Sequence, residues 1–333
     1  MDISGKHELV RQDDGFIPEK LIVIGNGAIE RGWSPVREVL DEMIIAIDDY
    51  PIHPRKLGLS ESLSLLALQE RRSKQFVIRE LTSLINGASA DFDEMKNSFW
   101  YLERICLSFR EALAKVYASS REISIKEKVL KVLKEEGLEK SSTAVITTNW
   151  DNLLWDYGSE RLRNLIHLHG RCSSWETLLL PTETSEENAF FLLMSKDLEE
   201  RIKNSDRITD KVKENCLLLL RKAFSPPKNE SEYWKSFSVH LNYAHGRALK
   251  WIREAGELVI CGVNFNPFDH ELLTVFSDKK VSDSPEKWRK IVIISDEEKE
   301  WKKTAGLLKT EIEACTFIHL ESFWKKIKRF FSL

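Results

Sequence analysis

Amide, carboxylate and imidazole side chains follow two short apolar runs near the middle of the chain. Asn149 and Asp151 come shortly after the run 144–146, and His169 comes shortly after the run 165–166. Apolar runs of this length predict buried strands, and a parallel sheet binds ligands at the carboxyl ends of its strands. An amide can position a substrate and an imidazole can accept a proton near neutral pH. We therefore expect these three side chains to meet in one crevice.

Each of these residues also has a simpler structural interpretation. Asn149 could cap a helix, with Asp151 in its first turn where negative charge is favoured. His169 could be a hydrogen-bonded imidazole at the end of a strand. The order of the motifs along the whole chain is needed to choose between the two interpretations.

A glycine loop follows the first apolar run, 21–24, and consists of Gly25, Asn26, Gly27 and Ala28. Glycines here would let the backbone approach a phosphate group, and a helix capped by Ser34 would point its positive end at the same place. The full Gly-x-Gly-x-x-Gly spacing is not met, and two glycines after a strand often form only a tight turn.

The elements that would position these side chains alternate between strands and helices, which predicts an α/β fold: a Rossmann-like parallel sheet with helices on both faces. The expected strands are 21–24, 144–148, 165–168, 258–261, 291–294 and 315–318, with a weaker candidate at 178–180.

We expect a single domain over 1–333. Its core would comprise about 18–50, 140–182 and 255–320. Helical insertions would span about 51–139 and 183–254 and form a smaller helical subdomain. The apolar stripes predict helices that end at Asn86-Gly87 and at Gly137. A C-terminal helix at 321–333 carries a basic face, which is typical of a docking helix or of a helix on a membrane surface.

The composition excludes several classes of protein. The formal net charge is −3, so nucleic acid is not expected as the main partner. The five cysteines are widely spaced and form no Cys-x-x-Cys pair, which argues against a structural metal site and a disulfide framework. There is no apolar signal region and no apolar run near the ~20 residues of a membrane span. We expect a cytoplasmic protein with no metal.

The motifs and their order resemble the sirtuin family. The resemblance rests on the glycine loop, on Thr147-Thr148-Asn149-Trp150-Asp151, on Leu168-His169-Gly170 and on Cys261-Gly262-Val263-Asn264 with Asp269 and Leu272 beyond. It spans about 21–320, although only these short motifs are close.

The resemblance implies that the protein binds NAD. Gly25, Asn26, Gly27 and Ala28 would lie against its phosphates, Asn149 and Asp151 beside the nicotinamide ribose, and His169 would match the family's catalytic histidine. The same resemblance adds further cofactor-binding residues: Thr148, Gly262, Asn264, Ser295 and Asp296.

Two departures from ordinary sirtuin deacylases narrow the expected activity. The chain lacks the two cysteine pairs of the zinc ribbon that helps to form the acyl-peptide groove, and it has helical insertions instead. It is similar to the divergent bacterial branch found in antiviral defence, which hydrolyses NAD to ADP-ribose and nicotinamide. That similarity implies control by assembly, as a homo-oligomer or with a second defence subunit (a HerA-type ATPase or a nucleotide-sensing protein).

Three alternatives remain open at this point. A protein deacylase would need an acyl-peptide groove without the zinc ribbon. A regulatory module would bind NAD or ADP-ribose without turning it over. A Rossmann dehydrogenase is the third alternative, but this chain lacks both the full glycine fingerprint of that class and the acidic residue expected about 20 residues beyond it.

Overall fold

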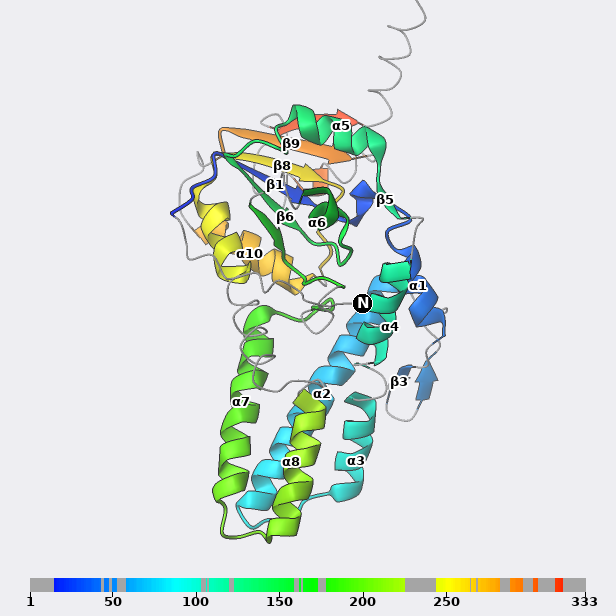
Figure 1. Ribbon diagram of the computed structural model, residues 1–333, viewed down its shortest axis with the longest axis vertical. Coiled ribbons are helices and arrows are strands. Elements are labelled where there is room, and N and C mark those ends of the chain that lie inside the picture. The colour runs from blue at the N-terminus through cyan, green and yellow to red at the C-terminus, as the bar shows by residue number, and fades with distance from the viewer. Residues whose placement is uncertain are drawn as a thin grey trace, which may run out of the picture.

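Six parallel strands form the central sheet of the protein, shown in a computed structural model in Figure 1. They are β1 (Lys20–Ile24), β6 (Thr143–Thr147), β7 (Leu165–His167), β8 (Glu257–Cys261), β9 (Lys290–Ser295) and β10 (Cys315–His319). The structure describes residues 15–42, 45–47, 50–52, 58–102, 106, 108–119, 123–158, 162, 164–172, 178–224, 244–263, 265–267, 269–281, 288–295, 302–304 and 315–319.

The strand order is β10-β9-β8-β1-β6-β7, and every neighbouring pair is parallel. From β1 the chain first builds outward through β6 and β7, and it then returns to β8 on the other side of β1. This is the order of a doubly wound Rossmann sheet, with its topological switch point between β1 and β8. The predicted α/β, Rossmann-like fold is therefore confirmed.

Helices cover both faces of this sheet. On one face α5 (Glu127–Glu135) packs Val129, Val132 and Leu133 against the strands. On the other face lie α10 (His270–Val281) and the helical residues 244–254, which bury Trp251 and Ile252. Because α5 and residues 244–254 pack on the sheet, both belong to the core, although they fall inside the two predicted insertions.

Four helices from the two insertions form one helical bundle that extends away from the sheet (Figure 1). It contains α2 (Leu59–Ile85) and α3 (Phe92–Tyr101) from the first insertion, with α7 (Ser185–Asn204) and α8 (Asp210–Phe224) from the second. The bundle core draws on all four helices, from Val77 and Met95 to Leu198 and Leu220. Segments more than a hundred residues apart thus make a single subdomain.

A third helical layer links the bundle to the sheet. It consists of α1 (Ser34–Asp41), the first turns of α2, and α4 (Ser108–Ser119). Its core includes Val36, Leu66 and Phe109, together with Trp150 from the turn after β6. Trp150, which lies between the predicted site residues Asn149 and Asp151, is therefore part of the packing of this helical layer.

Short strands and turns complete the chain. β2 (Ile29–Glu30) pairs antiparallel with β5 (Ser124–Ile125), and β3 (Ile45–Ile47) pairs with β4 (Tyr50–Ile52). A 3-10 turn η1 (Asn26–Ala28) follows β1, and α6 (Leu153–Gly158) follows β6.

Several predicted boundaries are confirmed and others differ. α2 ends at Ile85 before Gly87, and α5 ends before Gly137; both glycines have positive φ, 86° and 92°. Residues 178–180 are buried but form no strand. Ser34 was predicted to cap α1 but is the first residue of this helix. The N-cap position is occupied by Trp33, whose side chain makes no capping hydrogen bond. The predicted helix 321–333 lies outside the described residues.

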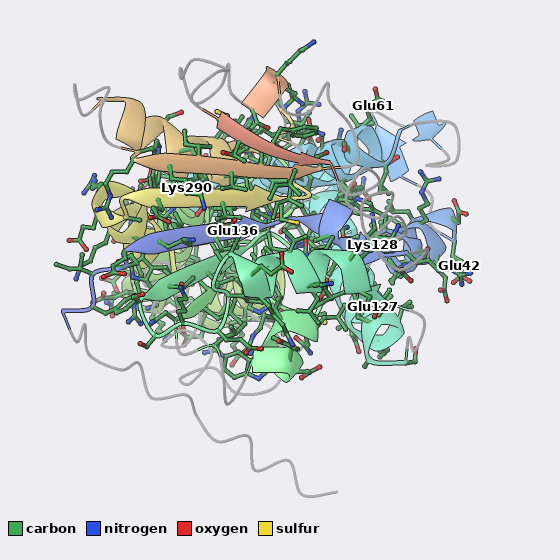
Figure 2. All side chains as sticks on the ribbon, turned by 90° about the horizontal axis from the view of Figure 1, so that it is seen from above. Glu42, Glu61, Glu127, Lys128, Glu136 and Lys290 are labelled. Carbon is green, nitrogen blue, oxygen red and sulfur yellow. The ribbon has the colours of Figure 1, made fainter. Side chains whose placement is uncertain are left out.

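Glu136 links strands at the amino-terminal edge of the sheet, where Figure 2 shows it near Lys290. The crevice is predicted at the other edge, at the carboxyl ends of the strands. The Glu136 carboxylate accepts hydrogen bonds from Lys20 at the start of β1 and Lys290 at the start of β9, at 3.2 and 3.0 Å. Burial raises the pKa of Glu136, but the two lysines outweigh it and the net pKa is lowered. This edge is stabilised by ion pairs, while the other edge carries the groups described next.

None of the helices that the structure describes is both long and apolar enough to cross a membrane.

Candidate active site

Two glycine loops meet at the switch point of the sheet, one after β1 and one after β8. The amide of Gly25 donates to the Cys261 carbonyl, and the amide of Gly27 donates to the Gly262 carbonyl, both at 2.9 Å. A Cβ atom added to Gly27 would lie 2.8 Å from the Gly262 Cα, and one added to Gly262 would lie 2.3 Å from the Ala28 nitrogen. Gly262 also has a φ of 61°. Only glycines allow this approach of the two backbones.

The same contacts determine which backbone donors the first loop could offer to a ligand. The N–H groups of Gly25 and Gly27 are bonded to the second loop, and that of Ala28 is bonded to the Gly25 carbonyl at 3.0 Å. A phosphate group in this crevice would therefore need other donors. The glycines shape the crevice by bringing the loops together.

Asn26 lies inside the first loop, with its side chain against Gly32. A Cβ atom on Gly32 would fall 2.0 Å from the Asn26 Oδ1 atom, so the absence of a side chain at position 32 makes room for this amide. The Oδ1 atom is buried and has no hydrogen-bond partner within the described part of the protein. It is an acceptor that a ligand hydroxyl group could satisfy.

The turn after β6 carries Asn149, whose backbone is fully bonded. Its N–H donates to the Thr147 hydroxyl at 3.1 Å, and its carbonyl lies 3.3 Å from Nδ1 of His167. The side chain is only 4% exposed, and neither its Oδ1 nor its Nδ2 atom has a partner among the residues described. Buried amides are almost always hydrogen-bonded in folded proteins, so this one is poised for a group that arrives from outside.

Asp151, two residues later, caps the helix α6. The sequence had suggested Asn149 for this capping role. Its Oδ1 atom accepts a hydrogen bond from the Leu153 amide at 2.9 Å, at the start of α6. Burial raises the pKa of Asp151 from 3.8 to about 6, because its backbone hydrogen bonds offset only part of the desolvation and Asp156 adds repulsion. Asp151 is thus a buried carboxyl group that changes its protonation state near pH 6.

Trp150, between them, faces away from the sheet and joins the turn to the segment 178–183. Its indole Nε1 donates to the Leu179 carbonyl at 3.2 Å, and its ring meets Trp33 edge-on with centroids 6.3 Å apart. The Leu179 amide in turn donates to the His169 carbonyl at 2.9 Å. The segment 178–183 therefore supports the turns after both β6 and β7.

Segment 178–183 is anchored to the helical layer by a buried arginine. Arg110 of α4 donates to the Leu178 carbonyl at 3.2 Å and binds Glu70 of α2 at 2.7 Å and Glu183 at 3.2 Å. Burial raises the pKa of Glu70, but Arg110 and Lys74 outweigh it and hold the net pKa low, at about 2. The helices thereby determine the position of a segment that contacts His169.

His169 follows β7 and has both ring nitrogens engaged. Nδ1 lies 3.0 Å from the Thr148 carbonyl, and Nε2 lies 3.0 Å from Oδ1 of Asp269. Burial lowers the pKa of His169, but Asp269, Glu271 and the Thr148 carbonyl outweigh it, so that its net pKa is raised. His167, two residues earlier, is buried and contacts Asn149.

Asp269 was not predicted as a site residue, although it belongs to the motif that follows Gly262. Its side chain caps α10 by accepting from the Leu272 amide at 3.1 Å. Glu271, on the first turn of the same helix, is buried and binds Nδ1 of His245 at 2.6 Å. A polar residue before a helix is normally interpreted as a cap, so the sequence carries no separate signal for the His169 contact.

The predicted residues fall into three groups in the structure. The glycine loops (Gly25, Asn26, Gly27, Ala28 and Gly262) and the ends of β6 and β7 (Thr148, Asn149, Asp151 and His169) lie along the carboxyl edge of adjacent strands. Ser295 ends β9, and the Gly262 amide donates to the neighbouring Ile294 carbonyl at 3.2 Å. Asn264 and Asp296 lie outside the described residues. Over the described ranges, no three His, Cys, Asp or Glu side chains gather as they would around a metal ion.

Comparison with known proteins adds no family to this picture. Neither the models of known protein families nor the curated protein sequences gave a match to this chain.

Proposed function

We propose that the protein hydrolyses NAD to ADP-ribose and nicotinamide, and that it does so as the regulated effector of a bacterial antiviral defence system that depletes NAD. The observation that carries the proposal is the Asn149 amide at the carboxyl end of β6, which is buried and has no hydrogen-bond partner among the residues that the structure describes. Asn149 follows β6, and the preceding Thr148 carbonyl contacts His169. β6 neighbours β1, at the switch point where Rossmann sheets bind dinucleotides. The sirtuin-like order of the motifs supports NAD as the dinucleotide.

The proposed chemistry follows from the bond to be broken. Cleavage of nicotinamide from ribose builds positive charge on the sugar, as in glycoside hydrolysis. The Asn149 amide has a donor and an acceptor with which to hold a ribose hydroxyl group and the attacking water. The Asp151 carboxylate, largely ionised above pH 6, would stabilise the developing cation through space. His169 would accept the proton of the attacking water or of a ribose hydroxyl group.

Control by assembly is part of the same proposal, because unrestrained NAD hydrolysis would harm the host cell. The protein would act in the cytoplasm, as a homo-oligomer or with a second defence subunit such as a HerA-type ATPase or a nucleotide-sensing protein. The contacts from Arg110 through segment 178–183 to His169 give the helices a physical route to the site. A partner that moved these helices would move the support of His169.

The test is NAD turnover by purified protein in excess over NAD, with nicotinamide and ADP-ribose both quantified. Wild-type protein should release the two products in equal amounts, while Asn149→Ala and His169→Ala should release neither. Asn164→Ala is the matched control: Asn164 lies before β7 at the opposite edge of the sheet, and its amide makes one long 3.4 Å bond to Ser141. Full turnover by the Asn149→Ala protein would refute the proposed site.

A second function, binding of NAD or ADP-ribose without turnover, is favoured by one observation. Both ring nitrogens of His169 are bonded to protein groups, to the Thr148 carbonyl and to Asp269, so the ring has no free lone pair with which to act as a base. Calorimetric binding of NAD with no product over the same period would favour this regulatory function. Nicotinamide release that requires an added acyl-lysine peptide would instead indicate a deacylase.

A further inference from the structure

The protonation state of His169 can be inferred from its two partners. A peptide carbonyl only accepts hydrogen bonds, so the 3.0 Å contact with the Thr148 oxygen requires a proton on Nδ1. An ionised carboxylate also only accepts, so the 3.0 Å contact with Asp269 requires a proton on Nε2. With both nitrogens donating, the ring is an imidazolium cation.

The surroundings of the ring favour that cation. Of the residues that the structure describes, Asp269 and Glu271 are the ionisable groups that act most on it, both at the start of α10, and Glu271 is itself bonded to His245. Asp269 is held in place because the same carboxylate caps α10, where its Oδ1 atom accepts from Leu272. The carboxylate is therefore fixed by the helix and cannot follow the ring if the ring turns.

A cationic His169 conflicts with the role of a base in NAD hydrolysis. A base must have an unprotonated nitrogen that faces the proton it removes. Nδ1 is committed to the backbone of the neighbouring turn, so Nε2 is the atom that could serve. Nε2 lies 3.0 Å from Oδ1 of Asp269, and in this contact it donates a proton instead of accepting one.

We propose that Asp269 is a positioning residue that keeps His169 doubly protonated in the resting site, and that His169 becomes a base only when Nε2 is released from Asp269. On release the ring gives its Nε2 proton to solvent. The neutral Nε2 then faces a substrate hydroxyl group or water and can accept its proton. The second half of this proposal rests on the proposed function; the resting protonation state does not.

Asp269→Asn separates charge from structure at this position. Asparagine caps helices as well as aspartate does, so its side-chain oxygen can still accept from Leu272 and hold the start of α10. What is lost is the negative charge beside Nε2. The control is Asp197→Asn, which removes the same charge from an exposed position on α7, 3.6 Å from Arg201.

The experiment is an NMR titration of the full chain with isotope-labelled histidine rings, in which the His169 signals are assigned by their absence from a His169→Gln protein. In the wild type both ring nitrogens should be protonated at neutral pH. In Asp269→Asn the pKa of His169 should fall by about 1 unit or more, since an opposite charge at this range shifts a pKa by about 1–3 units. Asp197→Asn should match the wild type.

Two results would overturn the proposal: a neutral His169 ring in the wild type at neutral pH, or the same His169 pKa in wild type and Asp269→Asn. The first needs only wild-type protein, so it decides the matter even if the variant does not fold. Neither measurement uses NAD, so a failure of NAD hydrolysis is distinguished from a failure of this inference. Where turnover is measured, the rising limb of the kcat/KM profile should move to lower pH in Asp269→Asn, and an unmoved limb would count against the proposal.

Discussion

The Thr148 carbonyl lies 3.0 Å from Nδ1 of His169, and this contact joins the turn after β6 to the turn after β7. It follows from the register of the two strands, in which Thr147 is the partner of His167. Asn149 and His169 each stand two residues beyond that pair. Parallel pairing of β6 with β7 thus brings an amide and an imidazole to equivalent places on one edge of the sheet.

Asn149→Ala should leave the protein as stable as the wild type. Within the described ranges the side-chain amide has no hydrogen bond that the substitution could break, and a buried polar group without a partner costs about 1–3 kcal/mol. Relief of that cost offsets the small cavity, so chemical denaturation should give a free energy of unfolding within about 1 kcal/mol of the wild type. A much larger loss would mean that the amide has a structural role.

Gly27→Ala should destabilise the fold, because its Cβ would lie 2.8 Å from the Gly262 Cα and neither backbone can yield without moving its strand. Overpacking of this kind costs about 1–3 kcal/mol. Gly246→Ala is the control: its Cβ would meet no atom of the described residues within 4 Å, and alanine is preferred in a helix. Measured by thermal denaturation, the Tm of Gly27→Ala should therefore be lower than that of the wild type, while the Tm of Gly246→Ala should not. Equal Tm values would contradict the contact between the glycine loops.

Asp151→Asn should stabilise the protein at neutral pH. Aspartate ionises near 3.8 in the unfolded chain and near 6 in the folded one, so the folded state binds the proton more tightly. The stabilisation that protonated Asp151 gives to the folded state is present below pH 3.8 and is lost as the pH rises through about 6. The difference between the two pKa values corresponds to a change of about 3 kcal/mol in the free energy of unfolding.

Asparagine at this position keeps an oxygen that can accept from Leu153 and carries no charge. The gain in the free energy of unfolding, measured by denaturation at a series of pH values, should be largest above pH 6 and vanish near pH 4. A gain independent of pH would show that the effect is not due to ionisation.

Arg110→Met should destabilise the protein strongly, because it leaves Glu70 and Glu183 buried without their shared cation. Breaking a buried ion pair by removing one partner costs about 3–5 kcal/mol. Arg201→Met, which breaks an exposed pair with Asp197, should cost less than about 1 kcal/mol. Urea denaturation of the two variants compares them directly, and similar losses would argue against the buried arrangement.

The sheet and its functional edge were predictable from short apolar runs. Each of the six main runs became a strand, and their alternation with helices indicated parallel pairing. Once the strands are parallel, residues such as Asn149 and His169 that directly follow two of them must share an edge. Local pattern is sufficient for this because buried strands are apolar on both faces.

The contacts that refine the site were not predictable, because they join elements through tertiary packing. Asp269 has the pattern of a helix cap and is one, yet its carboxylate also reaches His169. Residues 178–180 are as apolar as a strand, but Trp150 and Arg110 bind their carbonyls and hold them outside the sheet. The bundle of α2 with α7 depends on two insertions meeting in space, which periodicity alone does not encode.

The most direct test of the account is the fate of NAD incubated with wild-type protein and with Asn149→Ala in water enriched in the heavy oxygen isotope. We expect the wild type to yield nicotinamide together with ADP-ribose that carries one heavy oxygen atom at the anomeric carbon, and Asn149→Ala to yield neither. NAD left intact by the wild type, or heavy ADP-ribose formed equally well by Asn149→Ala, would contradict it.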